Sequence, residues 1–155
     1  MPLDFQQTLP EALTNIGFQE HHSFAEYGQA QWSIIDVVND RYNTILKDKF
    51  DLYHWLWYHE EDELAYFLIE AGSNAFHGDQ NQVGQKVPTF HLWLGSRGFI
   101  VGVQQEKAFP ALELFSQRTE TGGSAFFQRA KRVIFFDNPS KTKTVYFLYP
   151  LNLIK

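Results

Sequence analysis

The middle of the chain carries a helical pattern of apolar positions. They recur three and four residues apart over residues 62–77, which predicts one amphipathic helix whose apolar stripe faces a core. The apolar positions are Leu64, Phe67, Leu68, Ala71 and Ala75. Gly78 follows, and glycine commonly ends a helix because it adopts the left-handed conformation without strain. We therefore expect this helix to be the central element of the fold.

The N-terminal half gives shorter patterns. Pro10 in a first turn and Gly17 at the end predict a short helix over residues 10–17. The adjacent His21 and His22 are expected in a solvated loop. Apolar residues at helical spacing, with Ser33 as a possible cap, predict a second helix over residues 33–47. The aromatic segment at residues 50–58 fits either a short strand or a helix.

Two pairs of strand-like runs follow the central helix. They are residues 87–94 with 99–104, and residues 132–136 with 144–149. Gly-Ser-Arg-Gly separates the first pair and Asp-Asn-Pro-Ser the second, and both are turn signals. Short helical segments are expected between the pairs, at residues 110–115 and 124–131. This order predicts an α+β domain, a two-layer α/β sandwich with helices on one face of a mixed, mostly antiparallel sheet.

Composition agrees with one folded domain spanning residues 1–155. Hydrophobic residues make up 44% of the chain and aromatic residues 17%, which is enough for a substantial core. The absence of cysteine excludes disulfides, thiolate metal sites and cysteine nucleophiles. A formal net charge of -5 argues against a general nucleic-acid binder. No apolar run has the length of a membrane span and the N-terminus does not resemble a signal peptide, so we expect a soluble, cytoplasmic protein.

The second face of the central helix carries the candidate chemistry. Polar side chains recur there three or four residues apart: Tyr66, Glu70, Ser73, Asn74 and His77. A carboxylate, an amide and an imidazole therefore project together near the end of one helix. Spacing alone is more typical of a solvated polar face. The chemical interpretation depends on the segments that follow the helix.

The sequence Glu70-Ala-Gly-Ser-Asn74-Ala75, followed by a strand pair and a Gly-Gly-Ser loop, resembles the GHKL ATP-binding fold. That superfamily includes gyrase, MutL, sensor histidine kinases and the anti-sigma-factor serine kinases. The form Glu-Ala-x-x-Asn-Ala is most similar to the anti-sigma-factor kinase branch. The resemblance covers residues 35–150.

The resemblance implies roles for the polar face of the helix. Glu70 would act as general base or orient the attacking group, and Asn74 would coordinate the Mg²⁺ that bridges the phosphates. One helical turn places both side chains on one face, where oxygen ligands suit a hard cation. His77 with Gly78 resembles the His-Gly pair that ends this helix in many members, one residue nearer the asparagine than is usual.

The two glycine boxes of the family are kept unequally. The first, Asp-x-Gly-x-Gly-Phe, corresponds to residues 104–109, where Gln104 replaces the aspartate that binds adenine and both glycines are lost. A glutamine amide oxygen accepts the same hydrogen bond without charge. The second box, which contacts phosphates through backbone N–H groups, is resembled by Gly122, Gly123 and Ser124.

The resemblance implies a regulatory protein that binds ATP and Mg²⁺, in the manner of an anti-sigma-factor serine kinase, with catalysis weakened or lost. It also implies a protein partner and a possible homodimer. The alternative is a non-catalytic interaction module on the same fold that no longer binds nucleotide. A third interpretation, a metal-dependent hydrolase, would use His54, His59, Glu63 and His77, which have no recognised ligand spacing.

Overall fold

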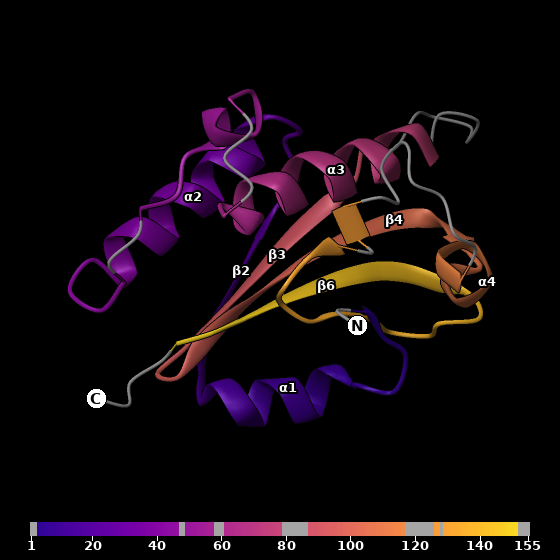
Figure 1. Ribbon diagram of the computed structural model, residues 1–155, viewed down its shortest axis with the longest axis horizontal. Helices are drawn as coiled ribbons and strands as arrows, with labels where there is room; N and C mark the ends of the chain where they lie inside the picture. Colours follow the sequence, from indigo (N-terminus) through magenta and orange to yellow (C-terminus); the bar gives the residue numbers. More distant parts are fainter. Residues whose placement is uncertain are drawn as a thin grey trace.

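The computed structural model describes residues 3–46, 49–57, 61–78, 87–116, 126, 127 and 129–151. Within these ranges the chain forms an open, mostly antiparallel sheet with helices packed against it (Figure 1). The strands are β1 (Leu3–Asp4), β2 (Phe18–Phe24), β3 (Thr89–Gly95), β4 (Gly98–Phe109), β5 (Ile134–Phe136) and β6 (Thr142–Pro150). The helices are α1 (Leu9–Ile16), α2 (Gln29–Arg41), the 3-10 helix η1 (Leu52–Trp55), α3 (Glu63–Gly78) and α4 (Ala111–Ser116). None of them combines the length and apolar character needed to cross a membrane.

The strands lie in the order β1-β5-β6-β4-β3-β2, so β1 and β2 form the two edges of the sheet. Only the short β1–β5 pair is parallel among these strands, and every other neighbouring pair is antiparallel. The central helix and both predicted strand pairs are confirmed, with β3–β4 and β5–β6 as the two pairs. The mixed, mostly antiparallel sheet is therefore as the sequence predicted.

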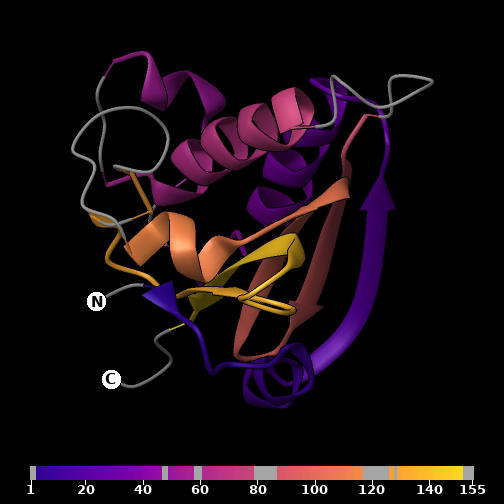
Figure 2. The ribbon, with the colours of Figure 1, turned by 90° about the vertical axis from the view of Figure 1, so that its right-hand side faces the viewer.

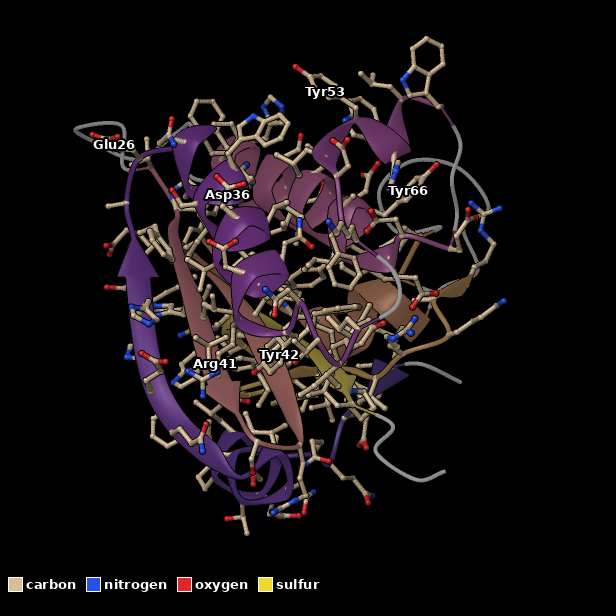
Figure 3. All side chains as sticks on the ribbon, turned by 90° about the vertical axis from the view of Figure 1, so that its left-hand side faces the viewer. Glu26, Asp36, Arg41, Tyr42, Tyr53 and Tyr66 are labelled. Carbon is tan, nitrogen blue, oxygen red and sulfur yellow. The ribbon has the colours of Figure 1, made fainter. Side chains whose placement is uncertain are left out.

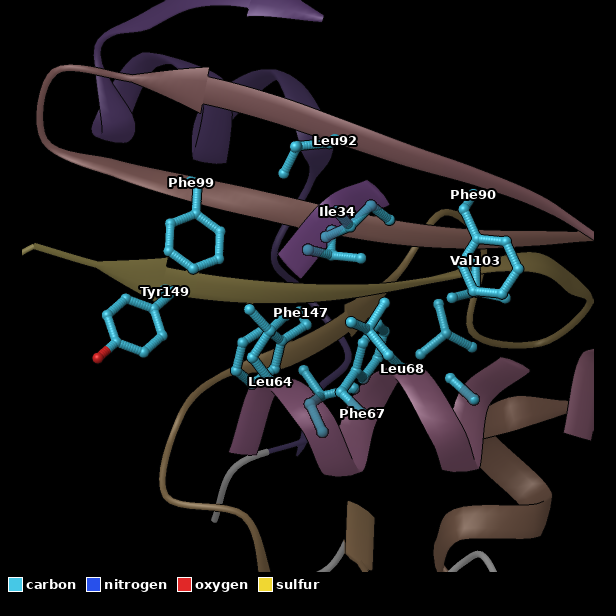
Figure 4. Close-up of a cluster of buried hydrophobic side chains, with 14 of the residues drawn as sticks. Ile34, Leu64, Phe67, Leu68, Phe90, Leu92, Phe99, Val103, Phe147 and Tyr149 are labelled. Atoms are coloured by element: carbon cyan, nitrogen blue, oxygen red, sulfur yellow. The ribbon is translucent and has the colours of Figure 1, made fainter. Parts of the chain in front are cut away.

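Helices α2 and α3 cover one face of this sheet (Figure 4). The apolar stripe of α3 packs against strand residues that alternate along β3, β4 and β6, because successive side chains of a strand point to opposite faces. Leu64, Phe67 and Leu68 of α3 are fully buried in this cluster. Phe67 stacks on Phe147 of β6 with ring centroids 5.2 Å apart. This packing fixes which side of α3 faces outward.

Helix α1 covers the opposite face, so the expectation of helices on one face only is wrong (Figure 1). Ala12 and Ile16 pack in a second apolar cluster with Trp93, Ile100, Phe135 and Tyr146. Thr8 caps the start of α1, and Gly17 ends it at a φ of 64°. The strands β3, β4 and β6 are apolar at consecutive positions, which is the pattern of a sheet buried on both faces.

Two further local expectations need correction. Helix α2 begins at Gln29 and ends at Arg41, whereas residues 33–47 were predicted. Its start is fixed by the Gln31 side chain, which accepts a hydrogen bond from the N–H of Gly28 at 2.8 Å. The expected loop at His21 and His22 is strand β2 instead. An edge strand exposed on both faces has no apolar alternation by which sequence could identify it.

Tyr42, the C-cap residue directly after α2, joins this helix to the β3–β4 turn. Its buried hydroxyl donates toward the carbonyl oxygens of Gly95 at 2.9 Å and Gly98 at 3.2 Å, and accepts from the N–H of Gly95 at 3.1 Å. Burial raises the pKa of this phenol. Gly95 is required here because a Cβ would lie 2.2 Å from the carbonyl oxygen of Ile16. Both layers of helices thus meet the same turn.

Replacing Tyr42 by phenylalanine tests this junction. Tyr42→Phe keeps the ring and leaves the N–H and carbonyl of Gly95 without the hydroxyl, so we expect the free energy of unfolding to fall by about 1–3 kcal/mol. Urea denaturation followed by circular dichroism measures this change. Tyr53→Phe is the matched control, because Tyr53 is 55% exposed, and it should leave stability nearly unchanged. Equal effects of the two substitutions would contradict the proposed role of the hydroxyl.

Candidate functional site

The polar face of α3 points away from the sheet because its apolar stripe is buried against it. Tyr66 and Glu70 are half-buried, whereas Asn74 and His77 are exposed. His77 lies near the ring of Phe76, with centroids 5.9 Å apart. All of these residues lie in the single helix Glu63–Gly78, which is the helix that the sequence predicted. Their chemistry depends on what surrounds each group.

Glu70 is the most distinctive group of this face. Its carboxylate forms no hydrogen bond or ion pair with any residue in the described part of the chain. Burial raises its pKa above the ordinary value of 4.5, because a carboxylate loses hydration there without gaining a partner. A partly dehydrated carboxyl with a raised pKa is suited to accepting a proton near neutral pH.

Asn74 lies one helical turn after Glu70. Within the described ranges its side chain likewise makes no hydrogen bond. A carboxylate and an amide oxygen are ligands that Mg²⁺ prefers, since it is a hard cation. The two side chains therefore fit the predicted magnesium site in donor type and in helical spacing.

The chain returns to this face after the Gly-Gly-Ser segment. Gly122, Gly123 and Ser124 themselves lie outside the described residues. The description resumes at Phe126, whose ring stacks on Tyr66 with centroids 5.9 Å apart. Tyr66 lies one turn before Glu70, so the polypeptide that follows the second glycine box reaches the polar face of α3.

Gln104 does not belong to this face. Phe99, Val101 and Val103 of β4 point toward α3, so Gln104, next in the alternation, points to the face that α1 covers. Its side-chain oxygen accepts a hydrogen bond from His91 Nε2 at 2.8 Å on that face. The structure therefore brings Glu70 and Asn74 together and places Gln104 across the sheet from them.

Gln105 is the polar residue of β4 that sequence analysis missed. Its burial matches that of Val101 and Val103, although the pairing of β4 with β6 becomes irregular after Gln104. Gln105 is only 8% exposed, and its amide donates to the carbonyl oxygen of Lys107. Counting in twos from the apolar residues of the strand, rather than aligning to the motif, would have identified it.

The residues of the predicted metal-dependent hydrolase are engaged elsewhere. His54 Nδ1 donates to the buried carboxylate of Asp62, which also accepts from the N–H of Asp51. Glu63 accepts from two backbone N–H groups, of Lys131 at 2.6 Å and of Arg132 at 3.0 Å. His59 lies outside the described residues. Within the described ranges, no three His, Cys, Asp or Glu side chains gather as a metal site.

Comparisons with known proteins add no assignment. No protein-family model matches the chain, and no curated protein is significantly similar to it. The function is therefore argued from the geometry of this site.

The raised pKa of Glu70 predicts a pH-dependent effect of removing its charge. The folded state binds this proton more tightly than the unfolded state, so stability falls as pH rises from the ordinary value of 4.5 through the raised value. Glu70→Gln stays neutral and avoids this loss. We expect the variant to melt at a higher temperature than the wild type at about pH 7, with no such gain at about pH 3.

Thermal denaturation at the two pH values measures this effect. The matched control is Glu26→Gln, because Glu26 is exposed in the segment before α2. A Glu70→Gln variant that loses stability at neutral pH would show that the carboxylate is stabilised by its surroundings.

Proposed function

We propose that this protein is a regulatory protein of GHKL-like fold that binds ATP and Mg²⁺ at the polar face of α3. Its serine-kinase activity toward a protein partner would be weakened or lost. The observation that carries the proposal is the pair Glu70 and Asn74, one helical turn apart and both without a partner in the described chain.

The order of elements supports this proposal. The helix bearing Glu70 and Asn74 is followed by the β3–β4 hairpin, a short helix and the β5–β6 pair, in the order on which the resemblance was based. The stacking of Phe126 on Tyr66 brings the chain after the second glycine box to the same helix. Residues from distant parts of the sequence thus converge where a nucleotide would lie.

Each group has a defined task in this proposal. Bound Mg²⁺ would neutralise phosphate charge, and the Asn74 side-chain oxygen would hold it. Glu70 would accept the proton of the attacking hydroxyl. Gln105, the buried amide next to Gln104 on β4, would take the adenine-binding role expected of Gln104. A neutral amide in place of an aspartate forms a weaker hydrogen bond, which is consistent with weakened catalysis.

A second candidate is a non-catalytic interaction module on the same fold. It is favoured by an apolar surface where η1 and the two residues after it lie beside α2, made of Trp32, Tyr53, Leu56 and Trp57. Figure 3 labels Tyr53 of this surface. Trp57 is 72% exposed, and Tyr53 contacts Trp32 edge-on with centroids 5.3 Å apart. Exposed aromatic residues are enriched where proteins bind one another. The proposed regulatory partner would dock there in either case.

Calorimetric titration with ATP, with and without Mg²⁺, separates the two candidates. We expect ATP binding that requires Mg²⁺ and is abolished by Asn74→Ala, because the variant lacks the oxygen that would hold the ion. The amide of Asn74 is exposed, so the substitution should leave the fold intact. Gln105→Ala should weaken binding roughly tenfold, the effect of one hydrogen bond of about 1–1.5 kcal/mol. Gln104→Ala is the matched control on the same strand, and it should bind as the wild type does.

Three other results of the titration would contradict parts of the proposal. Unchanged affinity in the Asn74→Ala variant would overturn the assignment of the magnesium ligand. Loss of binding in Gln104→Ala alone would place the nucleotide on the opposite face of the sheet. Absence of binding at millimolar ATP would favour the interaction module. Circular dichroism of every variant shows whether it is folded.

A further inference from the structure

Strand β2 is an open edge of the sheet. It lies at the end of the strand order, and its inner edge pairs with β3 (Figure 2). None of the helices lies beyond its outer edge in Figures 2 and 3, since α2 lies over one face of the sheet and α1 over the other. Its seven residues are exposed or half-buried throughout. An edge of this kind presents unpaired backbone donors and acceptors to another strand.

The regular part of β2 is long enough to pair. The register with β3 is uninterrupted from Glu20 to Phe24, and the single irregularity lies between Phe18 and Glu20. Bulges often protect an edge, but this one lies near the start of the strand and leaves the register of the remainder regular.

The sequence of β2 is symmetric in its chemistry. The strand reads Phe18-Gln19-Glu20-His21-His22-Ser23-Phe24, with a phenylalanine at each end and an uncharged polar residue inside each phenylalanine. A carboxylate, Glu20, precedes His21 and an imidazole, His22, follows it. In an antiparallel copy centred on His21, the carboxylate of each strand therefore lies opposite an imidazole of the other.

We propose that β2 pairs with β2 of a second copy of this chain, antiparallel and centred on His21. The two sheets then join into one continuous sheet across a two-fold axis. Glu20 lies opposite His22 of the partner subunit, and the reverse pair occurs on the other side of the axis. Beyond the irregularity at the start of β2, Phe18 comes near Phe24 of the partner subunit at the end of the paired segment. This assignment is independent of nucleotide binding.

The carboxylate of Glu20 and the imidazole of His22 support this register. Glu20 and His22 are on the same face of β2, where His22 Nε2 already donates to Glu20 at 3.1 Å. Arg41 of α2 also donates to Glu20, which keeps its carboxylate oriented on that face. A two-fold axis perpendicular to the sheet keeps the face of every residue, so the carboxylate meets the partner's imidazole directly. An imidazole N–H can donate a hydrogen bond to this carboxylate across the strands, and complementary side chains at directly opposed positions stabilise antiparallel strands.

The phenylalanine rings at the two ends of β2 also support pairing with a second copy. Phe18 is 45% exposed, although it lies in a strand and precedes a charged segment. Phe24 is half-buried at the other end of β2, beside the main core. In the dimer, each Phe18 ring would be covered near Phe24 of the partner subunit, and the two-fold axis repeats this contact at both ends of the paired strands. The exposed ring of Phe18 therefore gains a partner that the monomer lacks.

Cysteine cross-linking tests the register directly, because the natural chain has no cysteine. In a His21→Cys variant the two thiols face each other across the axis. Directly opposed Cβ atoms lie about 4.5–5.5 Å apart, close to disulfide geometry. We expect a covalent dimer on a non-reducing gel after mild oxidation. Ser23→Cys is the matched control, since its two copies would be about 13 Å apart, and it should stay monomeric.

A charge exchange tests the contacts. His22→Glu places like charges opposite each other, and so does the double variant Glu20→Lys, His22→Lys. Analytical ultracentrifugation should find a dimer for the wild type and a monomer for each variant alone. A mixture of the two variants should form a heterodimer, because every cross-strand pair is then opposite in sign. Rescue of this kind cannot arise from contacts within one strand.

Four results would overturn the proposal. They are a monomeric wild type at submillimolar concentration, a dimer unaffected by the charge changes, a mixture that does not associate, or cross-linking of Ser23→Cys as rapid as that of His21→Cys. A monomer whose β2 captures an unrelated extended peptide would give the first result. Leu112→Ser, at an exposed apolar residue of α4, is the control for surface change and should keep the dimer. Circular dichroism verifies that each variant is folded.

Discussion

The burial of the central sheet on both faces is the constraint on which the rest of the structure depends. Strands β3, β4 and β6 present apolar side chains in both directions, so a helix must lie on each side. Helices α2 and α3 satisfy one face and α1 the other. The apolar stripe of α3 is buried against the sheet, so the polar residues of this helix face away from the sheet. The candidate site lies on that outward face.

The sequence predicted those parts of the fold in which the local pattern agrees with the tertiary environment. Helix α3 and the β3–β4 hairpin combine clear periodicity with a glycine signal at an end, and both are confirmed. The side of the sheet taken by α1 could not be predicted, since eight residues carry no information on which of two apolar faces they cover. Strand β2 was missed because its identity depends on pairing with β3, which lies far along the chain.

The same distinction applies to the candidate site. Helical spacing predicted that Glu70 and Asn74 would share a face, since that relation is local. That neither side chain has a partner among the described residues depends on every neighbouring element, and it is visible only in three dimensions. The choice of Gln104 followed a motif, whereas the alternation of buried and exposed positions on β4 identifies Gln105 as the buried amide. Where a motif is degenerate, the period of the strand is the better guide.

The hydroxyl of Tyr42 has a consequence for how the chain folds. It bonds to Gly95, 53 residues further along the sequence, and so closes a loop that contains all of α3. The β3–β4 hairpin is local and can form rapidly by itself, whereas closure of so long a loop costs more chain entropy. We therefore expect the bonds between Tyr42 and the turn at residues 95–98 to form later than the hairpin itself. One phenol thus couples the local hairpin to the docking of the end of α2.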